Sequence, residues 1–362
     1  MKIAILHTWM DNVGGAEKVT LRLAKELNAD IYTTNINKKA IGDMGFKDVK
    51  IKSIGRVPLN SPFKQQTTFL MFRKLKLKDY DYFIITGDWA MSAAVNNKPS
   101  LFYANNAPCR ELFDLHDYNK RETFTSIQRP IPYLRDCLNR FLFKRYIKLC
   151  GKIIVNSKHV QKEFYKYFNI KSKVITPPVN TKDFKYKKNG DFWLSVSRFS
   201  PHKRLNLQLE AFRKLPKEKL IIIGWGEKTT YHKNYLKKLL KPKTENVTLM
   251  KSLPRKELID YYSKCKGIIT TTIREDFGLV PIEAMASGKP VIAPNEGGYK
   301  ETILDGITGK LIEDINVDKL VNAIKEVGKN PKKYKKACLK QAKKFDTKVF
   351  ITKMKEQMGY GQ

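Results

Sequence analysis

The stretch GIITTTIREDFGLVPIEAMASGKPVIA, residues 267–293, reads as a strand, a loop, a helix and a second strand in that order. Short apolar runs at 268–270 and 291–293 are typical of buried strands. Pro281 suits the first turn of a helix, because its ring fixes φ and it lacks an N–H. Gly278 lets a ligand approach the backbone closely. The stretch therefore predicts a helix N-terminus whose free N–H groups and dipole favour phosphate.

The same alternation of strand and helix patterns extends over most of the chain, which is typical of parallel sheets covered by helices. A polar stretch that begins near Pro177 and continues to Asp191 separates two such series. We therefore expect an α/β protein with two Rossmann-like, doubly wound domains, 1–184 and 185–342, facing a central cleft. A helical tail, 343–362, is expected to pack back on the first domain. The expected strands are 3–6, 82–86, 101–103, 153–155, 193–196, 220–223, 247–249, 267–270 and 291–293.

The charge of the 362-residue chain is strongly positive, since 70 Lys and Arg against 35 Asp and Glu give +35. Such a chain favours anionic partners: nucleic acid, an anionic membrane surface or phosphorylated substrates. Its five widely spaced cysteines do not form a disulfide or zinc pattern and indicate a reducing cytoplasm. No apolar run is long enough to span a bilayer, so we expect any membrane association to be peripheral. No histidine has a partner at metal-ligand spacing, and we predict no metal site.

Two acidic residues bracket the predicted helix start: Glu275 in the loop and Glu283 on the helix. Carboxylates accept hydrogen bonds from hydroxyl groups, so this pair predicts a polyol ligand such as a sugar or a ribose. The alternative is that both are solvated charges beside a helix.

Two basic residues follow the predicted strand at 193–196: Arg198 and Lys203. An arginine fork and a lysine ammonium at the end of a parallel strand can clamp a diphosphate. In so basic a chain, the alternative is that both are ordinary solvated surface.

Glycine pairs follow two other strands: Gly14 with Gly15, and Gly224 with Gly226. Each pair can let a phosphate or sugar approach the backbone, although a simple tight turn explains either equally well. Neither pair completes a dinucleotide fingerprint, and no Walker-type phosphate loop occurs, which argues against oxidoreductases and P-loop proteins.

Taken together, these motifs resemble glycosyltransferase family 4, whose members have the GT-B fold, and in particular its mannosyltransferase-like branch. The resemblance is carried by Arg198 with Lys203, by the turn 224–226, by the Glu275 and Glu283 pair, and by Gly297-Gly298 with Glu301-Thr302. Stretches 14–17, 155–158 and 174–181 of the first half also look like this family, so the resemblance covers nearly the whole chain.

The resemblance implies a metal-independent enzyme that transfers a sugar from a nucleotide diphosphate-sugar with retention of configuration, and that needs no cofactor. By analogy, Arg198 and Lys203 neutralise the leaving diphosphate, Glu275 holds donor hydroxyls and Glu283 holds the ribose. The other donor-binding positions that it implies are Gly14, Gly15, Asn106, Gly224, Gly226, Phe277, Gly278 and Leu279. Mannose from GDP-mannose is the favoured donor, UDP-sugars stay open, and the acceptor is expected to be a glycan or lipid-linked.

One position departs from the family pattern. The branch often has a histidine before Thr-Pro-x-Arg, where this chain has Asn106, as judged from Pro108 and Arg110. An asparagine can hydrogen-bond a sugar hydroxyl but carries no proton at neutral pH. The role of that histidine therefore does not transfer, and donor choice can differ.

Basic and large apolar residues are mixed in two stretches of the first half, 62–76 and 134–148. Such segments suit an interface with anionic lipid, as on the inner face of a membrane. The alternative is a helix whose apolar face packs on its own core.

Two other functions stay open. One is a GT-B epimerase of sugar nucleotides or a phosphorylase, although no pyridoxal phosphate site is recognisable. The other is a nucleic-acid-binding protein, which the charge suggests but no known nucleic-acid-binding motif supports, and we expect no specific nucleic-acid partner.

Overall fold

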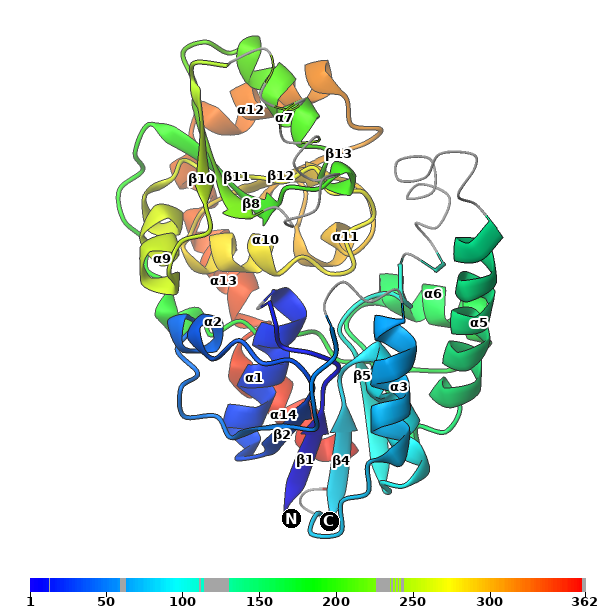
Figure 1. Cartoon of the computed structure of the whole chain (residues 1–362). Helices are drawn as coiled ribbons and strands as arrows, with labels where there is room; N and C mark the ends of the chain where they lie inside the picture. Colours follow the sequence, from blue (N-terminus) through cyan, green and yellow to red (C-terminus); the bar gives the residue numbers. More distant parts are fainter. Residues whose placement is uncertain are drawn as a thin grey trace. The chain divides into compact units, whose positions relative to one another are not determined.

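The computed structural model describes residues 1–12, 14–58, 63–110, 112–113, 130–225, 235, 237, 239, 241 and 244–359. The chain divides into two units, Met1–Pro177 with Phe350–Gln362, and Pro178–Val349. Each unit contains one sheet of parallel strands with helices packed on it (Figure 1). The predicted α/β class with two Rossmann-like sheets is therefore confirmed.

The first unit holds a seven-stranded sheet with the spatial order β3-β2-β1-β4-β5-β6-β7. The first strand of the chain, β1, lies inside the sheet, and later strands are added outward on both sides of it, as in doubly wound folds. The strands are β1 (Ile3–Leu6), β2 (Asp30–Thr33), β3 (Ile51–Ser53), β4 (Tyr82–Ile85), β5 (Ser100–Ala104), β6 (Lys152–Val155) and β7 (Lys173–Val174). The helices are α1 (Gly15–Leu27), α2 (Lys38–Asp43), α3 (Lys64–Lys74), η1 (Asp88–Val95), α5 (Pro130–Ile147), α6 (Lys158–Phe168) and most of α14 (Thr347–Gln357).

Both faces of the first sheet are covered, as two neighbouring residues of β5 illustrate. Successive side chains of a strand point to opposite faces. The ring centroid of Phe102 lies 6.4 Å from that of Phe164 on α6, whereas Tyr103 contacts Phe350 on α14 with centroids 5.5 Å apart. Burial on both faces explains why β1, β4 and β5 are continuous apolar runs.

The second unit holds a six-stranded sheet with the order β10-β9-β8-β11-β12-β13. Its strands are β8 (Phe192–Arg198), β9 (Lys219–Trp225), β10 (Val247–Lys251), β11 (Ile268–Ile269), β12 (Val291–Pro294) and β13 (Gly309–Ile312). Its helices include η3 (Thr181–Asp183), η4 (Pro201–Lys203), α7 (Leu205–Arg213), α9 (Arg255–Lys264), α10 (Leu279–Ala286), α11 (Tyr299–Thr302), α12 (Val317–Gly328), η5 (Pro331–Tyr334) and α13 (Lys335–Lys343). Among the described helices of the chain, none is long and apolar enough to cross a membrane.

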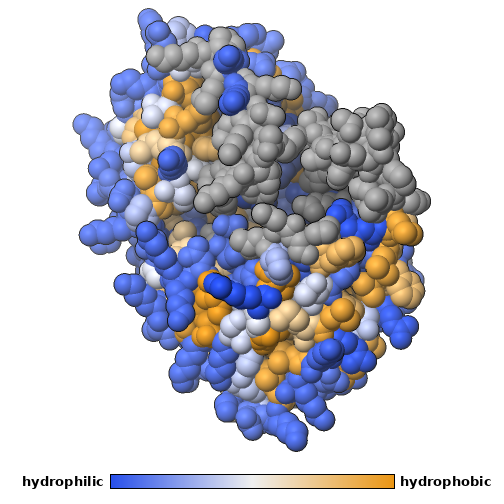
Figure 2. All heavy atoms as spheres, in the orientation of Figure 1, coloured by the Kyte–Doolittle hydropathy of each residue, from blue (hydrophilic) through white to orange (hydrophobic). Residues whose placement is uncertain are grey.

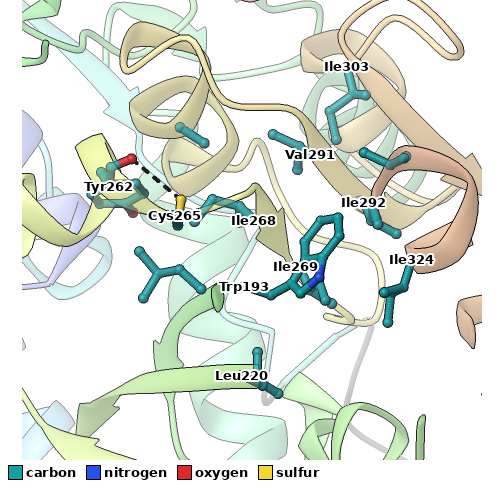
Figure 3. Close-up of a cluster of buried hydrophobic side chains, with 14 of the residues drawn as sticks. Trp193, Leu220, Tyr262, Cys265, Ile268, Ile269, Val291, Ile292, Ile303 and Ile324 are labelled. Atoms are coloured by element: carbon teal, nitrogen blue, oxygen red, sulfur yellow. Dashed lines mark hydrogen bonds between the residues drawn. The ribbon is translucent and has the colours of Figure 1, made fainter. Parts of the chain in front are cut away.

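The core of the second unit is centred on Trp193, which is fully buried (Figure 3). Aliphatic side chains of β9, β11, β12 and α12 belong to the same hydrophobic cluster as Trp193. The indole N–H of Trp193 donates a 2.8 Å hydrogen bond to Glu218 Oε2, which satisfies its one polar atom. The residue therefore fills the core without leaving an unpaired donor.

The boundaries of the units differ from the predicted ones. The chain enters the second unit at Pro178 rather than after residue 184, because Val179 and Phe184 are buried in the second core. It leaves at Val349 rather than at 342, since Phe345 packs on Phe277 in the same core with centroids 5.5 Å apart. Only the part of the predicted tail from Phe350 onward groups with the first unit.

A buried lysine attaches the segment before β8 to the second core. Lys289 is 0% exposed, and its Nζ donates to Lys187 O at 3.0 Å and to Asn189 Oδ1 at 2.5 Å. The ammonium also lies 4.4 Å from the ring centroid of Tyr186. Burial lowers the pKa of Lys289 to about 8.

This pKa predicts that the second unit becomes more stable as pH rises. Between pH 8 and the ordinary value of 10.5, the unfolded chain binds more protons at Lys289 than the folded chain, so the free energy of unfolding increases with pH. We expect the wild type to gain at most about 3 kcal/mol over this range relative to Lys289→Met, as measured by urea unfolding with tryptophan fluorescence. Parallel pH curves for the two proteins would show that Lys289 does not titrate in this range.

Candidate active site

Three loops of the second unit meet beyond the carboxyl edge of its sheet, where the parallel strands end. They follow β8, β11 and β12, and β11 lies between the other two strands. Backbone hydrogen bonds join them: Ile273 N–H donates to His202 O at 2.9 Å, and Gly298 N–H donates to Glu275 O at 2.7 Å. Ligands of open α/β sheets bind at this edge, so the loops form the candidate site.

The central contact is an ion pair between two residues predicted from separate motifs. Lys203 Nζ, at the end of η4, lies 2.9 Å from Glu275 Oε2 in the loop after β11. Their side chains are 14% and 22% exposed, so both are accessible yet partly shielded from solvent. This pair places a cation for an anionic ligand beside a carboxylate that can accept hydroxyl hydrogen bonds.

Arg204 was not predicted, and it links all three loops. Its Nε donates to Thr271 O at 2.6 Å, and its Nη2 lies 3.0 Å from Glu296 Oε1. The other oxygen of Glu296 accepts the backbone N–H of Arg274 at 3.1 Å. Arg204 has a positive φ of 48°, which turns the chain between η4 and α7. The sequence offers no signal for this role beyond one more base in a basic loop.

Tyr299 lies under the Glu275 loop and was also not predicted. Its hydroxyl is 2.6 Å from Thr270 Oγ1 and 3.5 Å from Glu275 Oε2. Burial, together with the charge of Glu275, raises the pKa of Tyr299 well above its usual range, so this hydroxyl keeps its proton. A Cβ on Gly278 would lie 3.0 Å from the Tyr299 ring, and Gly278 has a φ of 93°. A glycine is therefore needed there for packing as well as for the turn.

The structure does not link Arg198 with Lys203. Arg198 is the last residue of β8, and its side chain is exposed, with no hydrogen bond or ion pair to the described residues. Gly224 lies beside it, where a Cβ would be 1.8 Å from Ser197 O, so the close approach of β8 and β9 requires this glycine without any ligand. Gly226 lies outside the described residues.

The predicted residues on and before α10 divide between core and surface. Phe277 is a core residue that is 2% exposed, which leaves only its backbone for a ligand. Leu279 is half-buried and begins α10, after Gly278 as the N-cap. The first N–H groups of a helix lack partners within the helix, and here they adjoin the loop of Glu275.

Glu283 lies in a buried cluster separate from Glu275. Its Oε2 accepts the Tyr262 hydroxyl at 2.8 Å, and its Oε1 lies 3.6 Å from Arg255 Nη1. Arg255 also pairs with Asp183 at 3.0 Å. Burial lowers the pKa of Arg255, but the charges of Glu283 and Asp183 outweigh this effect and raise it. Both oxygens of Glu283 thus have protein partners, and its predicted contact with ribose stays a prediction.

In the first unit, Gly14 and Gly15 begin α1 beside a buried polar network. Gly14 N–H donates to Glu17 Oε2 at 2.8 Å, and Glu17 Oε1 lies 3.6 Å from His7 Nε2. Nδ1 of His7 is 2.9 Å from Thr86 Oγ1. Burial raises the pKa of Glu17, but the hydrogen bond and charge of His7 outweigh it and lower the pKa overall. The N–H of Gly14 is therefore already bonded within the protein.

Asn106 follows β5 at the carboxyl edge of the first sheet. The side chain is half-buried, and its amide donates to Ala107 O at 2.9 Å. The adjacent Asn105 donates to Thr86 O at 3.2 Å, which joins the loops after β4 and β5. The amide oxygen of Asn106 has no hydrogen bond to the described residues. Within the described parts of both units, no three acidic, histidine or cysteine side chains are grouped as metal ligands.

A protein-family model covers most of the second unit. Residues 179–345 match the model described as "Glycosyl transferases group 1". The ends of this range lie within four residues of the ends of the second unit, Pro178–Val349. The range includes all three loops of the candidate site.

Curated relatives include an uncharacterized glycosyltransferase of Methanocaldococcus jannaschii, which is 28% identical over 58% of this chain and 58% of its own length. The O-antigen chain mannosyltransferase RfbU of Salmonella typhimurium is 29% identical over 49% of this chain and 51% of its own length. The chain thus spans about half the length of these relatives. Among solved structures, Anabaena HepE in complex with UDP and glucose has a TM-score of 0.78 at 18% identity, with 99% of each chain covered. This likeness confirms the predicted GT-B fold.

The position of Arg204 predicts a distinctive pair of mutational effects. Arg204→Ala removes the guanidinium and keeps an L side chain at a φ of 48°, whereas Arg204→Gly removes the same bonds and relieves the backbone. We expect both variants to be less stable than the wild type, with the glycine variant about 1 kcal/mol more stable than the alanine variant, as measured by urea unfolding. Amide exchange at Arg274 should accelerate in both. Equal stabilities of the two variants would contradict a positive φ at this position.

Proposed function

We propose that the protein is a retaining, metal-independent hexosyltransferase, because residues 179–345 match the family model described as "Glycosyl transferases group 1". Its donor is a nucleotide diphosphate-sugar, with GDP-mannose favoured, and its acceptor is a glycan or a lipid-linked sugar. The observation that carries this proposal is the Lys203–Glu275 ion pair, in which two of the three predicted catalytic residues, Arg198 being the third, lie 2.9 Å apart beside the start of α10.

In the proposed reaction, the protein stabilises the departing diphosphate. The Lys203 ammonium and the exposed fork of Arg198 supply positive charge, and the N-terminus of α10 adds its dipole. Glu275 holds donor hydroxyls and so orients the sugar. The acceptor hydroxyl attacks the anomeric carbon as the bond to the diphosphate breaks, and its proton passes to the diphosphate oxygen.

Arg204 and Tyr299 act in this proposal as positioning residues. Arg204 fixes the loop after β11 through Thr271 and Glu296, and Tyr299 lies within 3.5 Å of the Glu275 carboxylate. Both are held by hydrogen bonds from neighbouring loops, so they keep Glu275 in place before the donor binds.

The comparisons support two candidate donors, a mannose donor and a UDP-sugar. A mannosyltransferase is among the relatives, which favours mannose. HepE was solved with UDP and glucose, which supports a UDP-sugar as the second candidate. In both cases the diphosphate is the same, so the roles of Arg198, Lys203 and Glu275 do not depend on the base.

Nucleotide binding tests the proposal first. We expect one nucleotide family, GDP or UDP with its sugar conjugates, to raise the melting temperature, by an amount equivalent to about 2.7 kcal/mol at 100 times the Kd. ADP should have a smaller effect. If no nucleotide stabilises the protein at saturation, the transferase proposal fails and nucleic-acid binding becomes the better explanation.

Sugar transfer, measured as release of the nucleoside diphosphate, tests the residues. Lys203→Met and Glu275→Gln should each lower kcat by about 10²–10³-fold, because each removes an electrostatic contact to the reacting groups. The matched control is Lys214→Met, which removes a lysine of the same unit that pairs with Asp318. Glu283→Gln should weaken nucleotide binding if Glu283 contacts ribose, and should lower only stability if it serves Tyr262 and Arg255. Activity should persist in EDTA.

We further propose that the first unit associates with an anionic membrane surface through α5. Leu134, Leu138 and Phe141 are 74%, 48% and 59% exposed on one side of this helix, and Arg145 falls on the same side. Phe143 and Ile147 are buried on the opposite side. Figure 2 shows hydrophobic side chains gathered over α3 and α5 among hydrophilic ones.

Parts of the two predicted basic stretches do not belong to this surface. Pro62 lies outside the described residues, and Lys64 pairs with Asp11 at 3.2 Å. Arg140 is turned inward, where its Nε donates to Leu112 O at 2.7 Å. The exposed bases that remain near the end of α5 are Lys144, Arg145 and Lys148. Basic residues beside exposed apolar ones complement anionic lipid.

The membrane proposal predicts a loss of vesicle binding when the apolar side of α5 is changed. The double variant Leu138→Gln, Phe141→Gln should bind vesicles containing 30% phosphatidylglycerol at least tenfold more weakly in co-sedimentation, because each side chain contributes about 1.5–3 kcal/mol when buried. Leu304→Gln, at an exposed leucine of the second unit, is the control. Undiminished binding of the double variant would refute a role for α5.

A further inference from the structure

A cavity of about 470 Å³ lies in the first unit, at the amino ends of β6 and β7. Its apolar lining is Ile147, Ile153, Ile154 and Ile170, of which Ile147 and Ile154 are buried. The strands of this sheet are parallel, so their amino ends lie at the edge opposite to the one that carries Asn106. The cavity is therefore separate from the residues to which the proposed transferase activity assigns a role.

Four lysines surround this cavity and come from successive segments of the chain. Lys148 follows α5, Lys152 begins β6, and Lys171 and Lys173 lie before and at the start of β7. Lys152 Nζ donates to Gln357 O at 2.6 Å, which attaches the end of α14 to one wall. None of the described residues that line the cavity is acidic.

Because 70 Lys and Arg face 35 Asp and Glu, many lysines of this chain lack a carboxylate partner, whereas Lys25, Lys52 and Lys266 each lie within 2.8 Å of a carboxylate oxygen. What distinguishes the four cavity lysines is that they are grouped around one cavity. Within the described residues, none of the four cavity lysines forms an ion pair with Asp or Glu. Four like charges around one cavity repel one another, and a bound anion would relieve that repulsion.

We propose that this cavity binds a phosphate-bearing anion, either the headgroup of a lipid or a free phosphate ester. A phosphate group can accept hydrogen bonds from several ammonium groups at once, and the four lysines converge from three segments. The isoleucine lining covers the carbon part of such a ligand. The volume lies within the range of small-molecule sites, about 300–1,000 Å³.

The test uses the full-length protein with saturating GDP and UDP, so that the candidate active site is occupied. The probes are dihexanoyl phosphatidic acid below its micelle concentration and sn-glycerol 3-phosphate, titrated by calorimetry. We expect saturable binding of at least one probe. The double variant Lys171→Gln, Lys173→Gln should weaken that binding at least tenfold. The matched control, Lys162→Gln with Lys166→Gln on the exposed side of α6, removes the same charge outside the cavity and should change affinity less than twofold.

The two probes distinguish the source of the anion. Tighter binding of the phosphatidic acid identifies a lipid headgroup, and equal binding identifies a free phosphate ester. Equal weakening by the cavity and control variants would overturn the proposal in favour of diffuse charge, and displacement by an oligonucleotide would overturn it in favour of nucleic acid. Loss of probe binding in Lys203→Met would instead place the ligand in the active site. Because nucleotide binding is measured separately, failure of this proposal leaves the transferase proposal intact.

Discussion

The candidate site depends on the hydrogen bond and the ion pair that the Arg204 guanidinium makes with two neighbouring loops. Loops after three different strands reach the carboxyl edge of the second sheet, and none is long enough to form a core of its own. Arg204 donates to the loop after β11 and pairs with Glu296 in the loop after β12, while its own backbone continues from the loop after β8. The short Lys203–Glu275 ion pair is a consequence, because its two partners are held by this scaffold.

Much of the fold was predictable because buried parallel strands are continuous apolar runs. Strands β1, β4, β5 and β12 have this form, and their predicted positions agree with the structure to within two residues at each end. The prediction omitted β2, β3, β7 and β13. These strands are short or carry charged and polar residues, as in Asp30–Thr33 and Gly309–Ile312, because they lie toward the edges of their sheets. An edge strand needs less apolar surface, so its sequence pattern is weaker.

The site was predictable where a residue's position in the chain determines its place in space. Lys203 and Glu275 were each predicted from a motif that follows a strand, and these strands, β8 and β11, are neighbours in the sheet. Their direct ion pair was not itself predicted. Arg204 could not be found in this way, because its role depends on a positive φ and on the path of Glu296. Phe277 and Gly224 also adjoin the site in sequence, and the structure gives each a structural role: Phe277 packs in the core, and Gly224 is required by the contact between β8 and β9. Their predicted contacts with the donor stay predictions.

The path of the chain between the units affects the order in which they can fold during synthesis. The second unit is an insertion whose two ends are bonded to each other, with Val179 N–H donating to Phe345 O at 2.9 Å. All of its residues have been made once Val349 leaves the ribosome. The first unit, although it begins the chain, buries Phe350 and Met354 in its core. The nascent amino-terminal segment must therefore wait for the last helix, and the unit that is translated second is the first that can complete its core.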